Sequence, residues 1–237
     1  MQFRIFYDKG KIRENNEDSY LIKEKPYPLL VVADGMGGHQ AGEVASKIAI
    51  DEINKFSLNF EEDIFMQIEK AIRKANKNIF ERANNNSSYR GMGTTLSMGI
   101  IINNYLYIGH IGDSRIYLFR ENNLSLETKD HTLVQKYVDD KKIKQEEAFY
   151  HPQKHILTQA LGVESNLNIQ IKKILLQEND ILIFCTDGLS DMLKKEDIKK
   201  ILLNNNLNID DISNVLGKEA LNKGGIDNIT FIAVLIN

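Results

Sequence analysis

The sequence has little of what marks several common classes of protein. One cysteine in 237 residues excludes an internal disulfide, and residues 1–11 lack the apolar stretch of a secretory signal. The longest apolar run, at 229–236, is far shorter than the roughly 20 residues that a membrane helix needs. Thirty basic residues nearly balance 33 acidic ones, and the net charge of −3 favours neither nucleic acid nor an anionic membrane as a partner. We therefore expect a cytoplasmic protein with no nucleic-acid partner and no membrane insertion.

Signals of a domain boundary are also missing. The chain contains only three prolines, no internal repeat and no long linker-like segment. A length of 237 residues is enough for a substantial hydrophobic core and is common for one α/β or layered β domain. We therefore expect one domain over residues 1–237.

Apolar segments of strand length recur along the chain and are separated by short polar breaks. They lie at 3–7, 29–33, 94–102, 105–111, 115–119, 168–176, 181–185 and 229–236. Breaks such as 103–104 and 112–114 are too short for a crossover helix. They favour antiparallel neighbours over a doubly wound parallel sheet.

Helical periodicity fills the longer gaps between these strands. In 64–80, apolar residues recur at steps of three and four with Lys and Glu between them, which predicts one buried stripe and one solvated face. Further helices are predicted at about 42–56, 132–139, 195–203 and 211–222. Antiparallel strands and amphipathic helices in separate blocks indicate an α+β fold, with helices packed outside one or two sheets.

Acidic residues lie near the ends of several predicted strands. They are Glu17, Asp18, Asp34, Asp113, Asp187 and Asp227. Any one Asp-Gly pair among them is explained by an ordinary turn. Four strand-end aspartates in one domain instead favour convergence on one site, where carboxylates repel each other unless divalent cations lie among them. Because the sequence offers no Cys/His cluster with ligand spacing, oxygen ligation favours Mg²⁺ or Mn²⁺ over zinc.

Eight motifs follow one another between residues 10 and 230. They read GKIRENNEDS, VVADGMGGHQAGE, GMGTTL, HIGDSRIYL, KDHTLVQ, HPQKHILTQALG, FCTDGLSDML and GGIDNIT. Together they closely resemble the bacterial branch of the metal-dependent protein phosphatase 2C (PPM) family. The resemblance implies a four-layer α/β/β/α sandwich, in which two antiparallel sheets are flanked by helices. It also implies hydrolysis of phosphoserine and phosphothreonine by direct attack of a water that bridges two metal ions.

The resemblance assigns metal ligands to individual residues of this chain. Asp34 resembles the carboxylate that bridges both ions, and the Gly35 carbonyl matches part of the second ion's site. Asp187 and Asp227 resemble the other direct ligands of the first ion. The resemblance thus implies two tightly bound Mn²⁺ or Mg²⁺ ions. Asp113, together with Asp187, matches the site of a weaker third ion in bacterial members.

Three further residues match the family's active site. Glu17 and Asp18 match the acidic pair that holds metal-bound waters. Arg13 precedes this pair by four and five residues and matches the arginine that grips the substrate phosphate. A guanidinium suits that task because it donates two parallel hydrogen bonds to one phosphoryl group, which a lysine cannot do.

The histidines fall into three groups. His39 has two interpretations, as the acid that protonates the leaving alkoxide or as a hydrogen-bond donor that orients a ligand. His110 lies inside a predicted strand, so we expect a core side chain. We assign no catalytic role to His131, His151 and His155, which lack metal-ligand spacing.

Residues 137–155 resemble the mobile flap that bacterial members place beside the active site. The segment is charged and has only a weak apolar pattern, as expected of a marginally packed lid. Two residues at or near it depart from the family's usual pattern. The family commonly has Asn where His155 stands and Arg where Gln159 stands, which puts the contacts of the flap in question.

Two other functions remain open at this point. The chain could be a catalytically weak regulatory domain that binds phosphoproteins, or a phosphohydrolase of small molecules. All three residues that resemble direct carboxylate ligands are present, Asp34, Asp187 and Asp227, which favours the protein phosphatase. Its partners would be phosphoserine and phosphothreonine proteins and a cognate bacterial Ser/Thr kinase, and we expect a monomer.

Overall fold

Two antiparallel sheets form the centre of the molecule. The computed structural model describes residues 1–37, 41–204 and 208–237. One sheet has the order β1 (Gln2–Asp8), β11 (Ile229–Leu235), β10 (Ile181–Cys185), β7 (Arg115–Arg120) and β8 (Asn123–Leu126). The other has the order β2 (Asp18–Lys23), β3 (Leu29–Met36), β5 (Leu96–Ile102), β6 (Tyr105–Ile111) and β9 (Gln170–Leu175), and β4 (Gly93–Thr94) pairs with β3.

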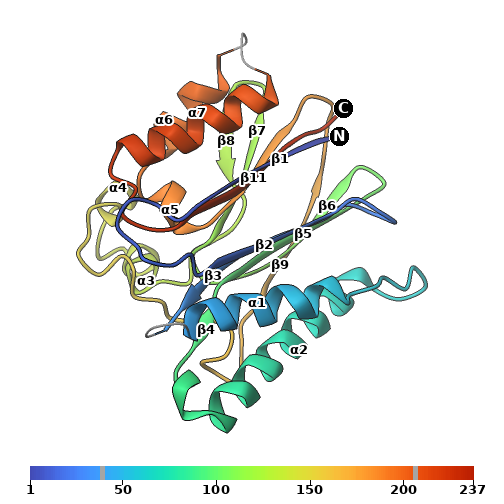
Figure 1. Cartoon of the computed structure of the whole chain (residues 1–237). Coiled ribbons are helices and arrows are strands. Elements are labelled where there is room, and N and C mark those ends of the chain that lie inside the picture. The colour runs from blue at the N-terminus through green and yellow to red at the C-terminus, as the bar shows by residue number, and fades with distance from the viewer. Residues whose placement is uncertain (38–40, 205–207) are drawn as a thin grey trace.

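Helices cover the outer face of each sheet (Figure 1). Next to the β2–β9 sheet lie α1 (Ala41–Asn54) and α2 (Ile64–Asn85), followed by a short 3₁₀ turn, η1 (Ser87–Tyr89). Next to the β1–β8 sheet lie α5 (Asp187–Ser190), α6 (Lys195–Leu202) and α7 (Ile209–Asn222). Two short helices, α3 (Leu133–Asp139) and α4 (Gln145–Ala148), lie at one end of the sandwich.

Three hydrophobic cores separate the four layers. One lies between α1, α2 and their sheet, one lies between the other sheet and α6 and α7, and the third lies between the two sheets. Strand β3 contributes to two of them, because Leu29 and Val31 belong to the helix-side core while Leu30 and Val32 belong to the core between the sheets. The structure thus confirms the expected α+β fold, a four-layer sandwich of two antiparallel sheets flanked by helices.

Some element boundaries differ from the sequence prediction. Strand β3 continues through Asp34 to Met36, so Asp34 lies inside the strand rather than just beyond it. The predicted strand at 94–102 is divided into β4 and β5. Strands β2 and β8 and helices α4 and α5 were not predicted. Among the described helices, none has both the length and the apolar composition needed to cross a membrane.

Candidate metal centre

Strand register places the first two acidic residues side by side. Asp18 in β2 and Asp34 in β3 are direct partners across the antiparallel pair. Asp18 is almost fully buried, and one of its oxygens, Oδ2, accepts a hydrogen bond of 2.9 Å from Thr186 Oγ1. Thr186 follows β10 of the opposite sheet and precedes Asp187. This bond therefore joins the two sheets at the point where their acidic residues meet.

Asp187 and Asp227 come from neighbouring strands of the other sheet. Asp187 follows β10 and begins α5, whereas Asp227 precedes β11, which pairs with β10. Close backbone packing holds the two segments together, because a Cβ atom at Gly188 would lie 1.9 Å from the carbonyl oxygen of Asn228. A larger residue at position 188 would push α5 away from Asp227, so glycine is required there.

The electrostatics show that the carboxylates converge. Burial first, and then the charge of Asp187, raises the pKa of Asp34, and the charges of Asp18, Asp113 and Asp227 act in the same direction. Burial also raises the pKa of Asp18, Asp113 and Asp227, and Asp187 again adds to each shift. Burial and neighbouring carboxylates therefore disfavour the ionised form of four described groups, Asp18, Asp34, Asp113 and Asp227, which is the situation that a divalent cation relieves.

One unpaired oxygen supports the fit of a cation to this site. The Oδ1 atom of Asp187 is buried and has no hydrogen-bond partner among the described residues. Such an atom is costly to bury unless a ligand satisfies it. The donor set consists of carboxylate oxygens, which suits Mg²⁺ or Mn²⁺. The residues present therefore fit the metal ions that the sequence predicts.

The backbone around Asp34 is held by hydrogen bonds and close packing. The Asp34 amide donates to Thr95 Oγ1, and the Thr95 amide donates to the Asp34 carbonyl, both at 2.9 Å. A Cβ atom at Gly35 would lie 2.2 Å from the Gly42 carbonyl oxygen and 2.6 Å from the Glu17 carbonyl oxygen. The glycine at position 35 is therefore needed for the first turn of α1 and the segment of Glu17 to approach β3.

Arg13 and Glu17 lie on a loop that is attached to the last strand. Asn228 Oδ1 accepts from the Glu17 amide at 2.8 Å, while Asn228 Nδ2 donates to the carbonyls of Lys9 and Asn15 at 2.9 Å. Arg13 is half-exposed, and its Nη2 atom donates to Asp227 Oδ2 at 2.7 Å. The structure thus brings a guanidinium to the edge of the carboxylate cluster.

One expectation about an individual side chain is confirmed, and another falls outside the structure. His110 is fully buried, its Nδ1 atom pairs with Ser97 Oγ at 2.8 Å, and burial lowers its pKa to about 3, as expected of a neutral core histidine. Cys185 is likewise buried, and this burial raises its pKa to about 12. His39 lies outside the described residues, so both of its interpretations remain predictions.

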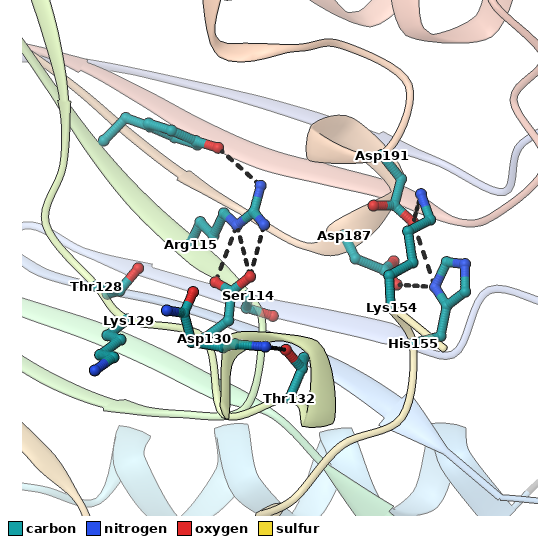
Figure 2. Close-up of polar contacts among 12 residues, drawn as sticks. Ser114, Arg115, Thr128, Lys129, Asp130, Thr132, Lys154, His155, Asp187 and Asp191 are labelled. Carbon is teal, nitrogen blue, oxygen red and sulfur yellow. Dashed lines mark hydrogen bonds and ion pairs between the residues drawn. The ribbon is translucent and has the colours of Figure 1, made fainter. Parts of the chain in front are cut away.

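The sequence analysis missed two residues next to Asp187. Asp191 follows it by four positions, a spacing that places both side chains on one side of a helix, but α5 was not predicted. His155 gave no such signal because it lies on a distant segment of the chain. Both side chains point toward Asp187 in Figure 2, and they line a cavity of about 790 Å³ that Asp113 and Tyr150 also line.

A pH-dependent difference in stability is expected at Asp113. Because burial raises its folded-state pKa above the ordinary value, protonated Asp113 favours folding, and this contribution is lost as the pH rises through the folded-state pKa. Asp113→Asn mimics the protonated form. In EDTA, the variant should therefore melt at a higher temperature than the wild type at pH 8, and its advantage should shrink toward pH 4.

Thermal unfolding of both proteins over this pH range measures the effect. Asp51→Asn, an exposed position on α1, is the control and should leave the difference from wild type nearly independent of pH. An advantage of Asp113→Asn that grows as the pH falls would contradict the burial of an ionisable carboxyl group.

Known proteins match this chain over nearly its whole length. A model of the protein phosphatase 2C family matches residues 11–223. The serine/threonine phosphatase stp of Listeria welshimeri is 36% identical over 234 residues, which cover 96% of this chain and 92% of that protein. The crystal structure of the serine/threonine phosphatase Stp1 from Staphylococcus aureus has a TM-score of 0.94 and 33% identity, and the match covers 100% of this chain and 95% of that chain.

A second solved structure bears on the metal ions. The catalytic domain of the serine/threonine protein phosphatase PstP, in complex with two manganese ions, is 33% identical with a TM-score of 0.87, and the match covers 100% of this chain and 98% of that chain. The two structural matches cover the whole chain, and the family model covers every segment that supplies a described carboxylate of the site except that of Asp227. The chain belongs to the protein phosphatase 2C family.

Proposed function

We propose that this chain is a metal-dependent protein serine/threonine phosphatase that hydrolyses phosphoserine and phosphothreonine. One observation carries the proposal: carboxylates from both sheets converge where Asp187 has a buried oxygen to which no described residue donates a hydrogen bond. The names of the relatives support the same reaction class. The substrates would be proteins that a Ser/Thr kinase of the same cell phosphorylates.

The metal ions would be held by groups from five segments of the chain. The proposed direct ligands are Asp34, the Gly35 carbonyl, Asp187 and Asp227, with Glu17 and Asp18 holding metal-bound waters and Asp113 serving a weaker third ion. When bound, Mn²⁺ or Mg²⁺ would supply an activated water and neutralise charge on the phosphoryl group. The carboxylates position these ions, and the threonines that bond Asp18 and the backbone of Asp34 fix the carboxylates.

The chain's own residues support direct hydrolysis rather than a phosphoserine intermediate. Ser114 follows Asp113, but it is fully buried and its Oγ atom pairs with Thr95 Oγ1 at 2.6 Å. It therefore lies in a hydrogen-bonded core position and not at a surface that a phosphoprotein could reach. Arg13, by contrast, is half-exposed and next to Asp227, where its guanidinium could orient a phosphoryl group.

Replacing Arg13 by alanine should weaken substrate binding more than turnover. A contact with the phosphate exists before the transition state, so its loss raises KM by severalfold or more, with a smaller fall in kcat. Steady-state kinetics on a phosphothreonine peptide at saturating Mn²⁺ measure both constants. Arg13→Lys keeps the charge but not the bidentate geometry, so its KM should lie between those of the wild type and Arg13→Ala. Equal inhibition of wild type and Arg13→Ala by inorganic phosphate would contradict this role.

One assay tests the proposed function against its two alternatives. Purified chain is incubated with a phosphothreonine peptide in Mn²⁺ and, in parallel, in EDTA, and released phosphate is measured. We expect release in Mn²⁺ and none in EDTA. Peptide binding without release would instead identify a regulatory domain, and release from small phosphate esters but from no phosphopeptide would identify a small-molecule phosphohydrolase. Either result would overturn the proposal.

A further inference from the structure

Two exposed isoleucines lie beside the proposed phosphate-binding arginine. Ile12 precedes Arg13 and is 68% exposed, and Ile226 precedes Asp227 and is 52% exposed. Among the residues that the structure describes, no other isoleucine is as exposed. Because Arg13 and Asp227 form an ion pair of 2.7 Å, each partner of this pair has an exposed isoleucine as its N-terminal neighbour.

Two contacts hold these isoleucines next to each other. On their N-terminal side, the Lys11 amide donates a hydrogen bond of 2.7 Å to the Gly225 carbonyl. On their C-terminal side, Arg13 Nη2 donates to Asp227 Oδ2. The two chain segments are thus joined at both ends of this short stretch, and the two isoleucines between the contacts are neighbours.

The backbone of the loop that carries Arg13 is fixed against the last strand. A Cβ atom at Gly10 would lie 2.2 Å from the Asp227 carbonyl oxygen, so the loop packs directly on that segment. Asn228 Nδ2 donates to the carbonyls of Lys9 and Asn15, which lie on either side of the first isoleucine in the sequence. A surface held in this way is ordered before a ligand arrives, so binding costs little conformational entropy.

The position of the isoleucine pair distinguishes it from ordinary surface residues. Single exposed apolar side chains are common on protein surfaces and indicate no function. Here two neighbouring ones can be covered by one apolar group, which removes both from water. The loop between β1 and β2 also lies at the same end of the sandwich as α4 and α5, where the carboxylates meet (Figure 1).

A peptide whose phosphate reaches Arg13 brings its neighbouring residues close to the isoleucine pair. Consecutive Cα atoms are about 3.8 Å apart, in a bound peptide as in this loop. The residues that flank the phosphorylated one therefore lie one residue length from it. The isoleucines are separated from Arg13 and Asp227 by the same length, so the flanking side chains of the peptide are the groups that can cover them.

We propose that Ile12 and Ile226 bind an apolar side chain next to the phosphorylated residue of the substrate. The chain would then prefer phosphothreonine and phosphoserine sites with an aliphatic neighbour. The proposal rests on the proposed phosphatase function and adds a sequence preference to it. Lys9, Lys11 and Glu14 are also exposed on this loop, but exposed charges attract an opposite charge only weakly in water and are screened by salt.

Steady-state kinetics on three phosphothreonine peptides in Mn²⁺ test the proposal. The peptides differ only in the two residues that flank the phosphothreonine, which are leucine, serine or glutamate. The wild type should hydrolyse the leucine peptide with a kcat/KM at least about tenfold above that of the serine peptide, mainly through a lower KM, because the apolar contact exists before the transition state. In the double variant Ile12→Ser/Ile226→Ser, the two values should become nearly equal.

Two further variants make this test specific. Met66→Ser removes an apolar side chain that is 72% exposed on α2, and this matched control should keep the wild-type preference. Ile12→Val keeps a branched apolar side chain and should keep most of the preference. Both isoleucines are exposed, so their replacement leaves the core intact, and circular dichroism checks this. The proposal is overturned if the wild type shows no preference, if the preference survives in the double variant, or if the glutamate peptide is hydrolysed fastest.

Binding of non-hydrolysable peptides separates this proposal from the proposed function. The same peptides are made with a phosphonate in place of the phosphate, and fluorescence anisotropy in Mn²⁺ gives their Kd values. If the chain hydrolyses no phosphopeptide but binds the leucine peptide more tightly, and the double variant loses this difference, the isoleucine pair stands and only the proposed function fails. Hydrolysis of all three peptides with equal kcat/KM means that only the isoleucine pair fails. Equal Kd values in a chain without activity contradict both.

Discussion

Replacement of Asp34 by asparagine is expected to lower the rate of hydrolysis of a phosphothreonine peptide by more than about 100-fold. Substitution of a residue that only contacts a metal ligand already lowers metal affinity or activity by about 10- to 100-fold, and Asp34 is a proposed direct ligand. The charges of Asp18, Asp113, Asp187 and Asp227 all act on Asp34, so it lies centrally among the carboxylates. Removing its charge weakens the attraction of the whole cluster for divalent cations. Kinetics over a Mn²⁺ titration measure the loss.

The same substitution should leave the fold intact. Thr95 bonds the backbone of Asp34 and not its carboxylate, and asparagine has nearly the same shape. In EDTA, Asp34→Asn should even melt at a higher temperature than the wild type, because one buried charge has been removed. Mn²⁺ should then raise the melting temperature of the wild type far more than that of the variant. Near-normal activity of Asp34→Asn at saturating Mn²⁺ would refute the assignment, and Asp51→Asn serves as the control.

The central strands were predictable because a strand that is buried on both faces has an uninterrupted run of apolar residues. In β3, alternate residues face two different cores, so the segment at 29–33 is apolar without interruption. Two edge strands, β2 and β8, gave no such signal, although the edge strands β1 and β9 were predicted from their own apolar residues. Strand β2 lies at the edge of its sheet with Tyr20 exposed, and β8 has four residues at the edge of the other sheet. Their formation depends on a neighbouring strand more than on their own residues.

The acidic residues were predictable for a related reason. Asp187 and Asp227 flank adjacent strands, so a sequence that identifies the strands also identifies which carboxylates lie at their ends. The register that places Asp18 opposite Asp34 could not be read from the sequence, because β2 itself was missed. The approach of His155 was also out of reach, since a long loop with weak periodicity fixes no direction for its side chains.

In the motif GGIDNIT, the sequence analysis assigned a role to Asp227 but none to Asn228. It is 5% exposed and connects the last strand to the loop of Lys9 and Asn15 through two donated hydrogen bonds. A third bond fixes the Glu17 amide. The neighbouring Asp227 holds Arg13, so one short segment positions both the proposed phosphate-binding arginine and a proposed metal ligand. The structure therefore indicates a positioning role for Asn228, which holds the loop of Lys9, Asn15 and Glu17.

Asn228→Ala should lower both stability and activity. Three partly buried backbone groups lose their partner at once, and the loss of each hydrogen bond costs about 0.5–1.5 kcal/mol of unfolding free energy. The released loop should reduce kcat/KM on a phosphothreonine peptide by at least about tenfold, because small misplacements of positioning groups have effects of that order or larger.

Two further substitutions make the test of this role specific. Asn228→Asp keeps the acceptor for the Glu17 amide but turns an oxygen toward the carbonyls of Lys9 and Asn15 and adds a buried charge, so it should be no more stable than the alanine variant in EDTA. Asn222 is exposed at the end of α7, so Asn222→Ala is the matched control and should change neither the stability nor kcat/KM. Thermal unfolding in EDTA and steady-state kinetics in Mn²⁺ measure the two effects separately. If Asn228→Ala is less stable than the wild type but keeps its kcat/KM, then Asn228 contributes only to stability. The positioning role would be refuted, because the loop would hold Arg13 and Glu17 in place without the Asn228 side chain.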